Sequence, residues 1–309
     1  MNPRFRVYVS APMKSHLDDR QQGLLTAILE QLKRSDYIPL NQSGYFFPEH
    51  SNNARSLDIE WTLDGMDILM RECQGAMVLA FALWKVSDSS GEPLGFSSTE
   101  NNHLEGALAL SQGLPLLIIA EETARPRGIA SLWGGRFILR VPKDVDIDWL
   151  DTDSFQRPFN DWRKAIDSRR HVFLGYCSTA SSVANLVITF LEDQGIRVLD
   201  WQRDFTAGGT VLEQIEEAAR RCTGGIFLFT NDDTLKKGSQ IHAAPRDNVI
   251  FETGYFVQAK GKKRVLIIRE GNTKLPADVG GDIYLPLQDR SDISSIKPGL
   301  MKFIQERIL

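Results

Sequence analysis

The chain has 309 residues, 42% hydrophobic and 25% charged, which is typical of a globular protein and excludes a fibrous or intrinsically disordered one. Its formal net charge of −4 argues against a protein built mainly to coat nucleic acid, so we expect no direct nucleic-acid binding. This length exceeds the usual size of a single core and fits two domains of about 150 residues each.

Strand and helix patterns alternate along the first half of the chain. Apolar runs predict strands at residues 4–11, 75–83 and 114–122. Helical patterns, with a polar loop before the second, cover residues 21–36, 57–73 and 103–113. Strands that alternate with helices of this length imply βαβ units and a parallel sheet.

The second half repeats this order. We predict strands at residues 171–178, 196–202, 224–232 and 263–271. The helices between them cover residues 181–195, 210–222 and 248–261. Residues 141–170 alternate acidic and aromatic side chains without a clean strand, so we interpret them as a connection that is partly helical near Trp162. The expected domains are residues 1–160 and 168–309.

The two halves also carry an acid in matching places. Glu105 follows Cys73 by 32 residues, and Glu252 follows Cys222 by 30 residues. A short helix, a glycine and an apolar strand come after each glutamate. This pattern suggests two tandem copies of one flavodoxin-like arrangement. Because ligands bind beyond the carboxyl ends of strands in such sheets, we expect two clefts, one beside each glutamate.

Cysteine, histidine and apolar patterns bear on compartment and metal content. The three cysteines, Cys73, Cys177 and Cys222, lie in or beside apolar runs, which is typical of reduced, buried thiols in a cytoplasmic protein. The five histidines are too scattered for a zinc site, so we infer no metal. The longest apolar run covers only ten residues, 75–84, so we expect neither a signal peptide nor a membrane span.

Glu252 is the most informative single residue. Six of the nine residues from Val249 to Val257 are apolar, so a carboxylate here must be neutralised, paired or exposed to a cleft. One interpretation is a structural salt bridge with Arg246 or another base. The other is a catalytic acid. Asp247 or Asn248 is expected to cap the helix.

Five segments of the second half, in this order, resemble the TIR-like nucleotide-binding domain of bacterial anti-phage NADase effectors. They are residues 171–180, 198–218, 222–233, 245–268 and 273–286. The resemblance covers roughly residues 171–287. It implies cleavage of NAD+ between nicotinamide and ribose, with the glutamate of the last helix essential. That residue is Glu252 here, NAD+ is the substrate, and no cofactor is implied.

The chemistry of NAD+ is consistent with one carboxylate. Bound nicotinamide carries a positive charge and leaves as a neutral molecule, so it needs no proton from the enzyme, whereas ordinary glycoside hydrolysis usually needs two carboxylates. Glu252 can stabilise the ribose cation, hold its hydroxyls or attack C1′, and the sequence does not choose among these.

Seven further residues of the second half are candidate substrate contacts. Arg246 suits a phosphate or a pairing with Glu252, and the loop at residues 205–210 opens a helix whose free N–H groups favour an anion. The others offer aromatic surface, hydroxyls or polar groups near the expected cleft, although a purely structural role is equally consistent for the aromatic residues and Ser178. They are Tyr176, Ser178, Trp201, Asp204, Phe205 and Asn248.

In the first half, residues 6–13 and 98–119 resemble nucleoside 2-deoxyribosyltransferases. In that family a glutamate of the later motif attacks the sugar, and the matching residue is Glu105. Asp67 falls where the family places another acid, and Ser10 and Pro12 complete the expected pocket. Three interpretations stay open: an active N-glycosidic enzyme, a nucleotide-sensing pocket, or an acid that stabilises its helix.

The whole chain is thus expected to be an α/β protein of two tandem parallel-sheet domains, one deoxyribosyltransferase-like and one TIR-like. The leading hypothesis is an NAD+ glycohydrolase of anti-phage defence, controlled by a nucleotide activator at its first domain and forming a homo-oligomer when active. The alternatives are a non-enzymatic TIR-type scaffold, and a nucleoside or nucleotide N-glycosidase that acts through Glu105.

Overall fold

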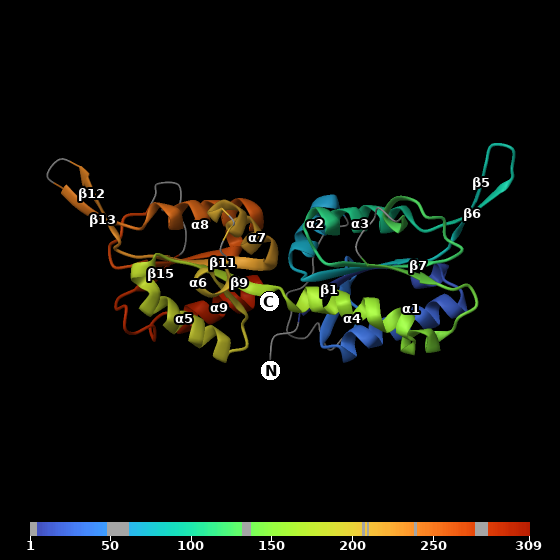
Figure 1. Cartoon of the computed structure of the whole chain (residues 1–309), viewed down its shortest axis with the longest axis horizontal. Coiled ribbons are helices and arrows are strands. Elements are labelled where there is room, and N and C mark those ends of the chain that lie inside the picture. The colour runs from blue at the N-terminus through green and yellow to red at the C-terminus, as the bar shows by residue number, and fades with distance from the viewer. Residues whose placement is uncertain are drawn as a thin grey trace. The chain divides into compact units, whose positions relative to one another are not determined.

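The computed structural model of the chain describes residues 5–47, 62–131, 137–205, 208, 210–237, 240–275 and 284–309. It divides into two compact units, the first ending at Ser168 and the second beginning at Arg169. In each unit helices cover both faces of a sheet (Figure 1). The prediction of an α/β protein with two parallel-sheet units is therefore confirmed.

The first unit contains a six-stranded sheet with the order β3-β2-β1-β4-β7-β8. All neighbouring pairs in it are parallel except β2 with β3. The strands are β1 (Phe5–Ser10), β2 (Tyr37–Asn41), β3 (Gly44–Tyr45), β4 (Gly75–Ala80), β7 (Leu116–Glu121) and β8 (Phe137–Val141). The helices are α1 (Asp19–Arg34), α2 (Leu63–Arg71), α3 (Glu100–Ser111) and α4 (Asp153–Asp167).

Two apolar layers hold this sheet. Helices α1 and α4 pack on one face, and α2 and α3 pack on the other. Helix α1 begins with a capping box, in which the Asp18 carboxylate accepts from the Gln21 N–H and the Gln21 side chain accepts from the Asp18 N–H. Leu24, Ile28 and Leu32 then recur every four residues and give the helix its buried side.

The second unit contains a five-stranded, fully parallel sheet with the order β10-β9-β11-β14-β15. Its strands are β9 (Arg170–Gly175), β10 (Val198–Asp200), β11 (Cys222–Phe229), β14 (Val265–Glu270) and β15 (Tyr284–Leu287). Its helices are α5 (Ser181–Asp193), α6 (Trp201–Asp204), α7 (Val211–Arg221), α8 (Asp247–Lys260) and α9 (Lys297–Phe303). Helices α5 and α9 pack on one face, and α7 and α8 on the other.

Helix α8 carries Glu252 and differs from its prediction at the amino end. Its N-cap is Arg246, which makes no side-chain capping bond, and Asp247 is already the first helical residue. The prediction of a cap from Asp247 or Asn248 is therefore wrong, because the turn after Pro245 starts the helix one residue early. Gly261, at φ 83°, ends it in a conformation that favours glycine.

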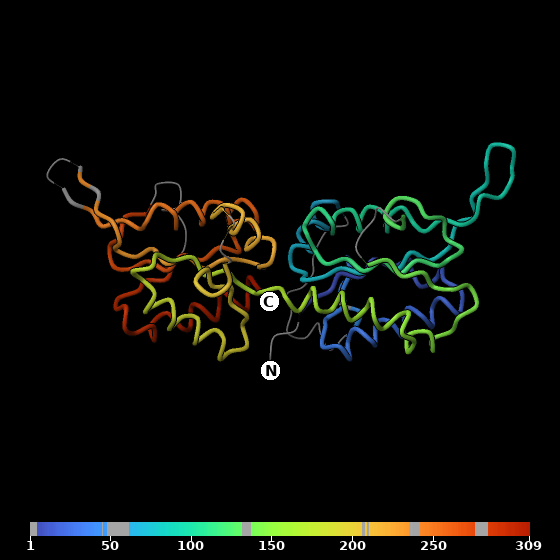
Figure 2. Tube along the Cα trace, in the orientation of Figure 1, coloured from blue at the N-terminus to red at the C-terminus, as the bar shows by residue number. Residues whose placement is uncertain are grey.

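Each unit also inserts a β-hairpin that the sequence analysis did not predict. The first is β5 (Trp84–Ser87) with β6 (Pro93–Ser97), and the second is β12 (Asp233–Lys237) with β13 (Gln240–Ala244). Both project from their units (Figures 1 and 2). Along the chain, the first hairpin lies between β4 and α3, which carries Glu105. The second lies between β11 and α8, which carries Glu252.

The segment expected to be a connection belongs to the first unit. After the strand β8, helix α4 buries Phe155, Phe159 and Trp162 in the core, so the expected helix near Trp162 is confirmed. The predicted strand at residues 196–202 is shorter than expected, because the chain turns into α6 at Trp201. No helix among the described residues is long and apolar enough to cross a membrane.

Candidate functional site

The candidate site lies where the strand order of the second unit reverses. The chain runs from β9 outward to β10, and then returns to the other side of β9 for β11, β14 and β15. Ligands of open α/β sheets bind at such a reversal, so we expect a binding crevice at the carboxyl ends of β9 and β11. Glu252 reaches this place from α8, because a Cβ added to Gly175, the last residue of β9, would lie 2.8 Å from its Oε2.

The surroundings of Glu252 are apolar. Its side chain is 6% exposed, and Oε2 has no hydrogen-bond partner in the described part of the chain. Phe256 lies one turn along α8, stacks on Phe173 at 5.1 Å between ring centroids, and meets Phe227 edge-on at 5.4 Å. Almost all buried side-chain oxygens in folded proteins have a partner, so an unpaired one calls for an explanation, such as an ordered water or a catalytic role.

Burial alone controls the ionisation of Glu252. Desolvation raises its pKa from 4.5 to about 7, and no charged or hydrogen-bonding group among the described residues offsets this effect. The carboxyl group is therefore poised near half ionisation at neutral pH. A raised pKa that comes from burial in a crevice is a recognised sign of a functional acid.

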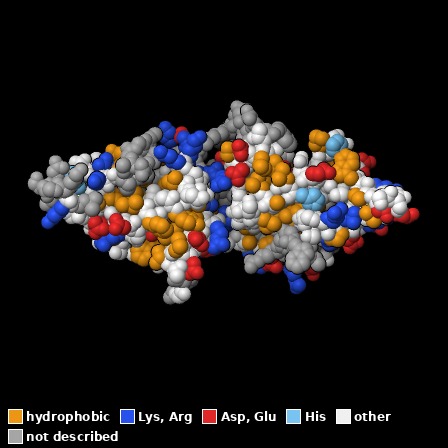
Figure 3. Space-filling view, turned by 90° about the horizontal axis from the view of Figure 1, so that it is seen from above, with side chains coloured by type: hydrophobic (Ala, Val, Ile, Leu, Met, Phe, Trp, Pro, Cys, Tyr) orange, Lys and Arg blue, Asp and Glu red, His pale blue; other side chains and the backbone are white. Residues whose placement is uncertain are grey.

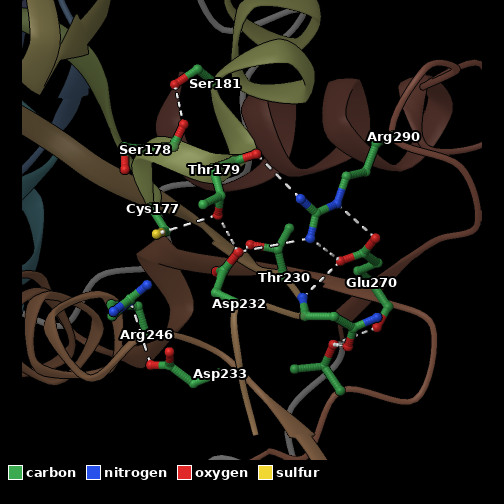
Figure 4. A network of polar contacts seen from close by, with 12 residues as sticks. Cys177, Ser178, Thr179, Ser181, Thr230, Asp232, Asp233, Arg246, Glu270 and Arg290 are labelled. Carbon is green, nitrogen blue, oxygen red and sulfur yellow. Dashed lines mark hydrogen bonds and ion pairs between the residues drawn. The ribbon is translucent and has the colours of Figure 1, made fainter.

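Arg246 is engaged away from Glu252. Its guanidinium lies 3.4 Å from the Asp233 carboxylate at the start of β12 (Figure 4). A hydrogen bond with Cys177, followed by the charge of Asp233, raises the pKa of Arg246. Burial opposes ionisation of the Cys177 thiol, but hydrogen bonds from Thr179 and Arg246 outweigh it and lower its pKa. The salt bridge that would have made Glu252 purely structural is not formed with Arg246.

A polar network that the sequence did not reveal fixes the loops beside this site (Figure 4). Asp232, after β11, accepts from Thr179 Oγ1 at 2.5 Å and from Thr230 Oγ1 at 2.6 Å. Arg290 donates to both oxygens of Glu270, each at 2.7 Å, and to the Thr179 carbonyl at 3.2 Å. The network therefore joins the ends of β9, β11, β14 and β15, and it holds the loops around the crevice in one arrangement.

Three of the predicted substrate contacts lie around the end of β10. Tyr176 is buried on the α5 side of the sheet, and its hydroxyl donates to Asp200 at 2.7 Å. Burial, reinforced by that carboxylate, raises the Tyr176 pKa. Trp201 lies against it at 5.7 Å between centroids, and the Asp204 carboxylate accepts from the Asp200 N–H at 2.8 Å.

The remaining candidates are Phe205, Ser178 and Asn248. Phe205 stacks on Phe173 at 6.0 Å, which brings it to the aromatic cluster around Glu252. Ser178 and Asn248 are exposed, Ser178 at the start of a short 3-10 helix after β9 and Asn248 in the first turn of α8. Residues 206, 207 and 209 of the expected anion-binding loop at residues 205–210 lie outside the described residues.

The first unit places Glu105 at the matching reversal point, between β1 and β4. Glu105 is 8% exposed and accepts a hydrogen bond from the Tyr8 hydroxyl at 2.6 Å. Burial raises its pKa, although hydrogen bonds from Ser10 and Tyr8 act in the opposite direction. The Asn102 amide in turn donates to Ser10 Oγ at 2.8 Å. Glu105 and Ser10 are therefore brought together as expected, and Tyr8 and Asn102 were missed.

Asp67 does not join this cluster. Its carboxylate pairs with Arg71 at 2.7 Å and accepts from Gln112 Nε2 at 2.7 Å, at the far end of α3. Gln112 lies seven residues beyond Glu105, which is about 10 Å along the axis of a helix. Pro12 is buried just after β1. Within the described ranges, no group of three or more His, Cys, Asp or Glu side chains could hold a metal ion.

Comparison with known proteins identifies the type of domain around Glu252. Residues 171–289 match the family described as "CAP12/Pycsar effector protein, TIR domain". The C-terminal unit carries a TIR domain. Within it, Glu252 stands on the helix before the fourth strand of the sheet, at the crevice described above.

Named proteins are similar to somewhat more than a third of this chain. CD-NTase-associated protein 12 of Sphingobacterium faecium is 29% identical over 113 residues, which are 37% of this chain and 35% of that protein. The Pycsar effector protein PaPycTIR of Pseudomonas aeruginosa is 33% identical over 114 residues, 36% of this chain and 37% of that protein. The match thus spans about a third of the length of these relatives.

A solved structure is also similar to part of this chain. The TIR domain of the Toll-related receptor TRR-2 from Hydra magnipapillata is 18% identical, with a TM-score of 0.34. The match covers 44% of this chain and 99% of that domain.

Proposed function

We propose that the TIR domain hydrolyses NAD+ at the bond between nicotinamide and ribose, and that Glu252 is its catalytic residue. The observation that carries this proposal is the buried Glu252 Oε2, which has no partner among the described residues at the reversal point of the sheet. The similarity to named Pycsar effectors supports a place in bacterial anti-phage defence.

The proposed reaction needs little from the protein. The C1′–N bond breaks, its electron pair neutralises the nicotinamide ring, and the positive charge moves to the ribose. A water molecule then adds to C1′ and loses a proton, which gives ADP-ribose. An ionised Glu252 stabilises the ribose cation and can accept a hydrogen bond from a ribose hydroxyl.

The electrostatics of the site favour this role. Glu252 lies in an apolar environment that makes its lone negative charge costly until a positive charge arrives. Bound NAD+ brings that charge on its nicotinamide ring, so substrate binding itself promotes ionisation of the acid. The same environment strengthens the attraction to the ribose cation, because the local dielectric constant is low.

The first test asks whether the protein is an enzyme or a scaffold. The full chain is incubated with NAD+ over a range of protein concentrations, and free nicotinamide is measured by chromatography. We expect release that increases with added nucleotide activator or with protein concentration. No release under any of these conditions would favour the non-enzymatic scaffold.

We also propose that the first unit binds a nucleotide that activates the TIR domain. The buried cluster of Glu105, Tyr8, Ser10 and Asn102 supports this role, because it gathers polar groups at the place where ligands bind in such sheets. Coupling requires a nucleotide with different affinities for the inactive and active states. Calorimetry of the full chain against a nucleotide panel tests it, and an absence of binding would contradict it.

The same cluster supports a second candidate activity, an N-glycosidase that acts through Glu105. Release of free base from nucleosides by a Glu252→Gln protein would reveal it, because that variant lacks the proposed TIR acid.

We further propose that the active form is a homo-oligomer. Val211, Leu212 and Phe251 are 64%, 46% and 54% exposed on α7 and α8, the helices on one face of the TIR domain. Hydrophobic side chains are visible on this side of the unit (Figure 3). Exposed apolar groups on adjacent helices favour contact with another protein surface. Sedimentation with and without nucleotide tests the assembly.

A further inference from the structure

The two units present the same kind of acid in two different states. Glu105 on α3 and Glu252 on α8 each lie on the helix that follows the third strand and its hairpin. Both are less than 10% exposed, at 8% and 6%. The first acid accepts hydrogen bonds from the protein, and Oε2 of the second accepts none from the described residues.

Two positions of the first strand account for this difference. Strands β1 and β9 each have six residues and end at Ser10 and Gly175. In its sheet, β1 lies between β2 and β4, and β9 lies between β10 and β11. Both ends pair with the third strand, Ser10 with Val78 and Gly175 with Phe227. Two residues earlier, on the same side of each strand, stand Tyr8 and Phe173.

In the first unit both positions supply a hydroxyl to the acid. Tyr8 donates to Glu105 Oε1 at 2.6 Å, and Ser10 makes a second hydrogen bond to the same carboxyl group. In turn, Asn102 fixes the Ser10 side chain, with a bond of 2.8 Å to Oγ. Glu105 is therefore held by the protein before any ligand arrives.

In the TIR domain both hydroxyls are absent. Phe173 has the ring of Tyr8 without its donor, and Gly175 has no side chain at all. A Cβ on Gly175 would stand only 2.8 Å from Glu252 Oε2, so the carboxylate would have to shift, and a serine there would bring a hydroxyl group within its reach. No φ between +20° and +160° demands glycine at this position, so the backbone alone does not explain it.

We propose that Phe173 and Gly175 are positioning residues that keep Glu252 free of hydrogen-bond donors from the protein, and so leave its carboxylate to the ribose of the substrate. This inference rests on the proposed NAD+ cleavage. In the first unit, by contrast, Tyr8 and Ser10 already donate hydrogen bonds to Glu105, which makes this acid suited to hold a ligand. A carboxylate already bonded by two hydroxyls stabilises a cation less, because its charge is partly satisfied.

The test compares two variants that differ by one hydroxyl group, Gly175→Ser and Gly175→Ala. Both carry the same Cβ, which would press on the Phe227 ring at 2.5 Å, so the alanine variant controls for crowding. We expect Gly175→Ser to lower kcat about tenfold below Gly175→Ala, with KM similar in the two. The pH midpoint of its activity should also lie about one unit lower, since a donor to a carboxylate lowers its pKa. Equal kcat and equal midpoints would overturn the proposal.

If crowding at position 175 prevents folding of those variants, Phe173→Tyr provides a second test. The added hydroxyl should lower kcat and the pH midpoint in the same direction. In the first unit, Tyr8→Phe removes one donor and should raise the pKa of Glu105. These pKa values are measured by carbon-13 NMR titration of glutamate-labelled full chain, with Glu252→Gln and Glu105→Gln to assign the signals.

The NMR readout separates this inference from the proposed function. If the wild-type chain releases no nicotinamide, the proposed function fails, and the effect of the hydroxyls on the two carboxyl pKa values is still measured. If the chain is active but neither Phe173→Tyr nor Tyr8→Phe moves the pKa of its glutamate, the positioning role is wrong and the proposed function stands.

Discussion

Replacing Glu252 with glutamine removes a buried ionisable group while keeping its shape. In the folded chain its pKa is about 7, against 4.5 for an exposed glutamate. The unfolded chain therefore releases this proton first, and stability falls as pH rises from about 4.5 to about 7. Above that range the folded state bears the full free-energy cost of burying the ionised Glu252 carboxylate. A difference of about 2.5 units corresponds to about 3 kcal/mol.

The difference in unfolding free energy between the variant and wild type should thus depend on pH. The two pKa values give a gain in unfolding free energy for Glu252→Gln of about 1 kcal/mol at pH 5 and about 3 kcal/mol at pH 8. The buried amide adds a cost for its own unpaired donors, but that cost is independent of pH. The change between the two pH values is therefore the quantity to measure.

Calorimetry of the full chain at several pH values provides the assay. We expect the substitution to shift only the transition of the TIR unit, and to shift it further upward at pH 8 than at pH 5. Glu306→Gln makes the same chemical change at an exposed position of that unit and should leave both transitions in place. A stability difference between the variant and wild type that is the same at pH 5 and pH 8 would refute the claim that Glu252 is a buried, unpaired acid.

Three further outcomes follow from the same geometry. Nicotinamide release should rise with pH through about 7 as Glu252 ionises, and a profile that stays flat from pH 5 to pH 9 would contradict an acid that acts in its charged form. Leu212→Asp should reduce assembly of the active form, measured by sedimentation, whereas unchanged assembly would exclude the α7 surface as the contact. Asp232→Ala should lower the unfolding free energy by about 1–3 kcal/mol, because it leaves the buried hydroxyl of Thr230 without its carboxylate acceptor. It should also raise KM in steady-state assays, and unchanged stability and KM would show that the network does not hold the loops.

The sequence predicted the elements that carry long apolar patterns and missed the short ones. Strands β1, β4, β9 and β11 are buried runs, and their order with the helices was legible. Strand β2 is five residues long and contains Pro39, and a proline argues against a strand when only the sequence is known. Strand β15 has only four residues. The hairpins lie in polar segments whose pairing depends on the turns rather than on an apolar pattern.

The acid itself could be predicted, but its state could not. Glu252 was conspicuous as a carboxylate in an apolar helix, and the ion pair with Arg246 was the natural alternative. Arg246 instead meets Asp233 and Cys177, both outside α8. The supporting network joins Thr179 to Asp232 and to Arg290, which are 53 and 111 residues away in the chain. Such contacts exist only once the carboxyl ends of the strands have been brought together.

Nicotinamide release by the full-length protein, compared among wild type, Glu252→Gln and Glu105→Gln, tests the central claim most directly. Glutamine at position 252 should reduce kcat by about 100- to 1,000-fold, as loss of one strong electrostatic stabiliser does. Glutamine at position 105 should leave the chemical step intact when nucleotide is saturating. Full activity of the Glu252→Gln protein, folded by calorimetry, would contradict the account.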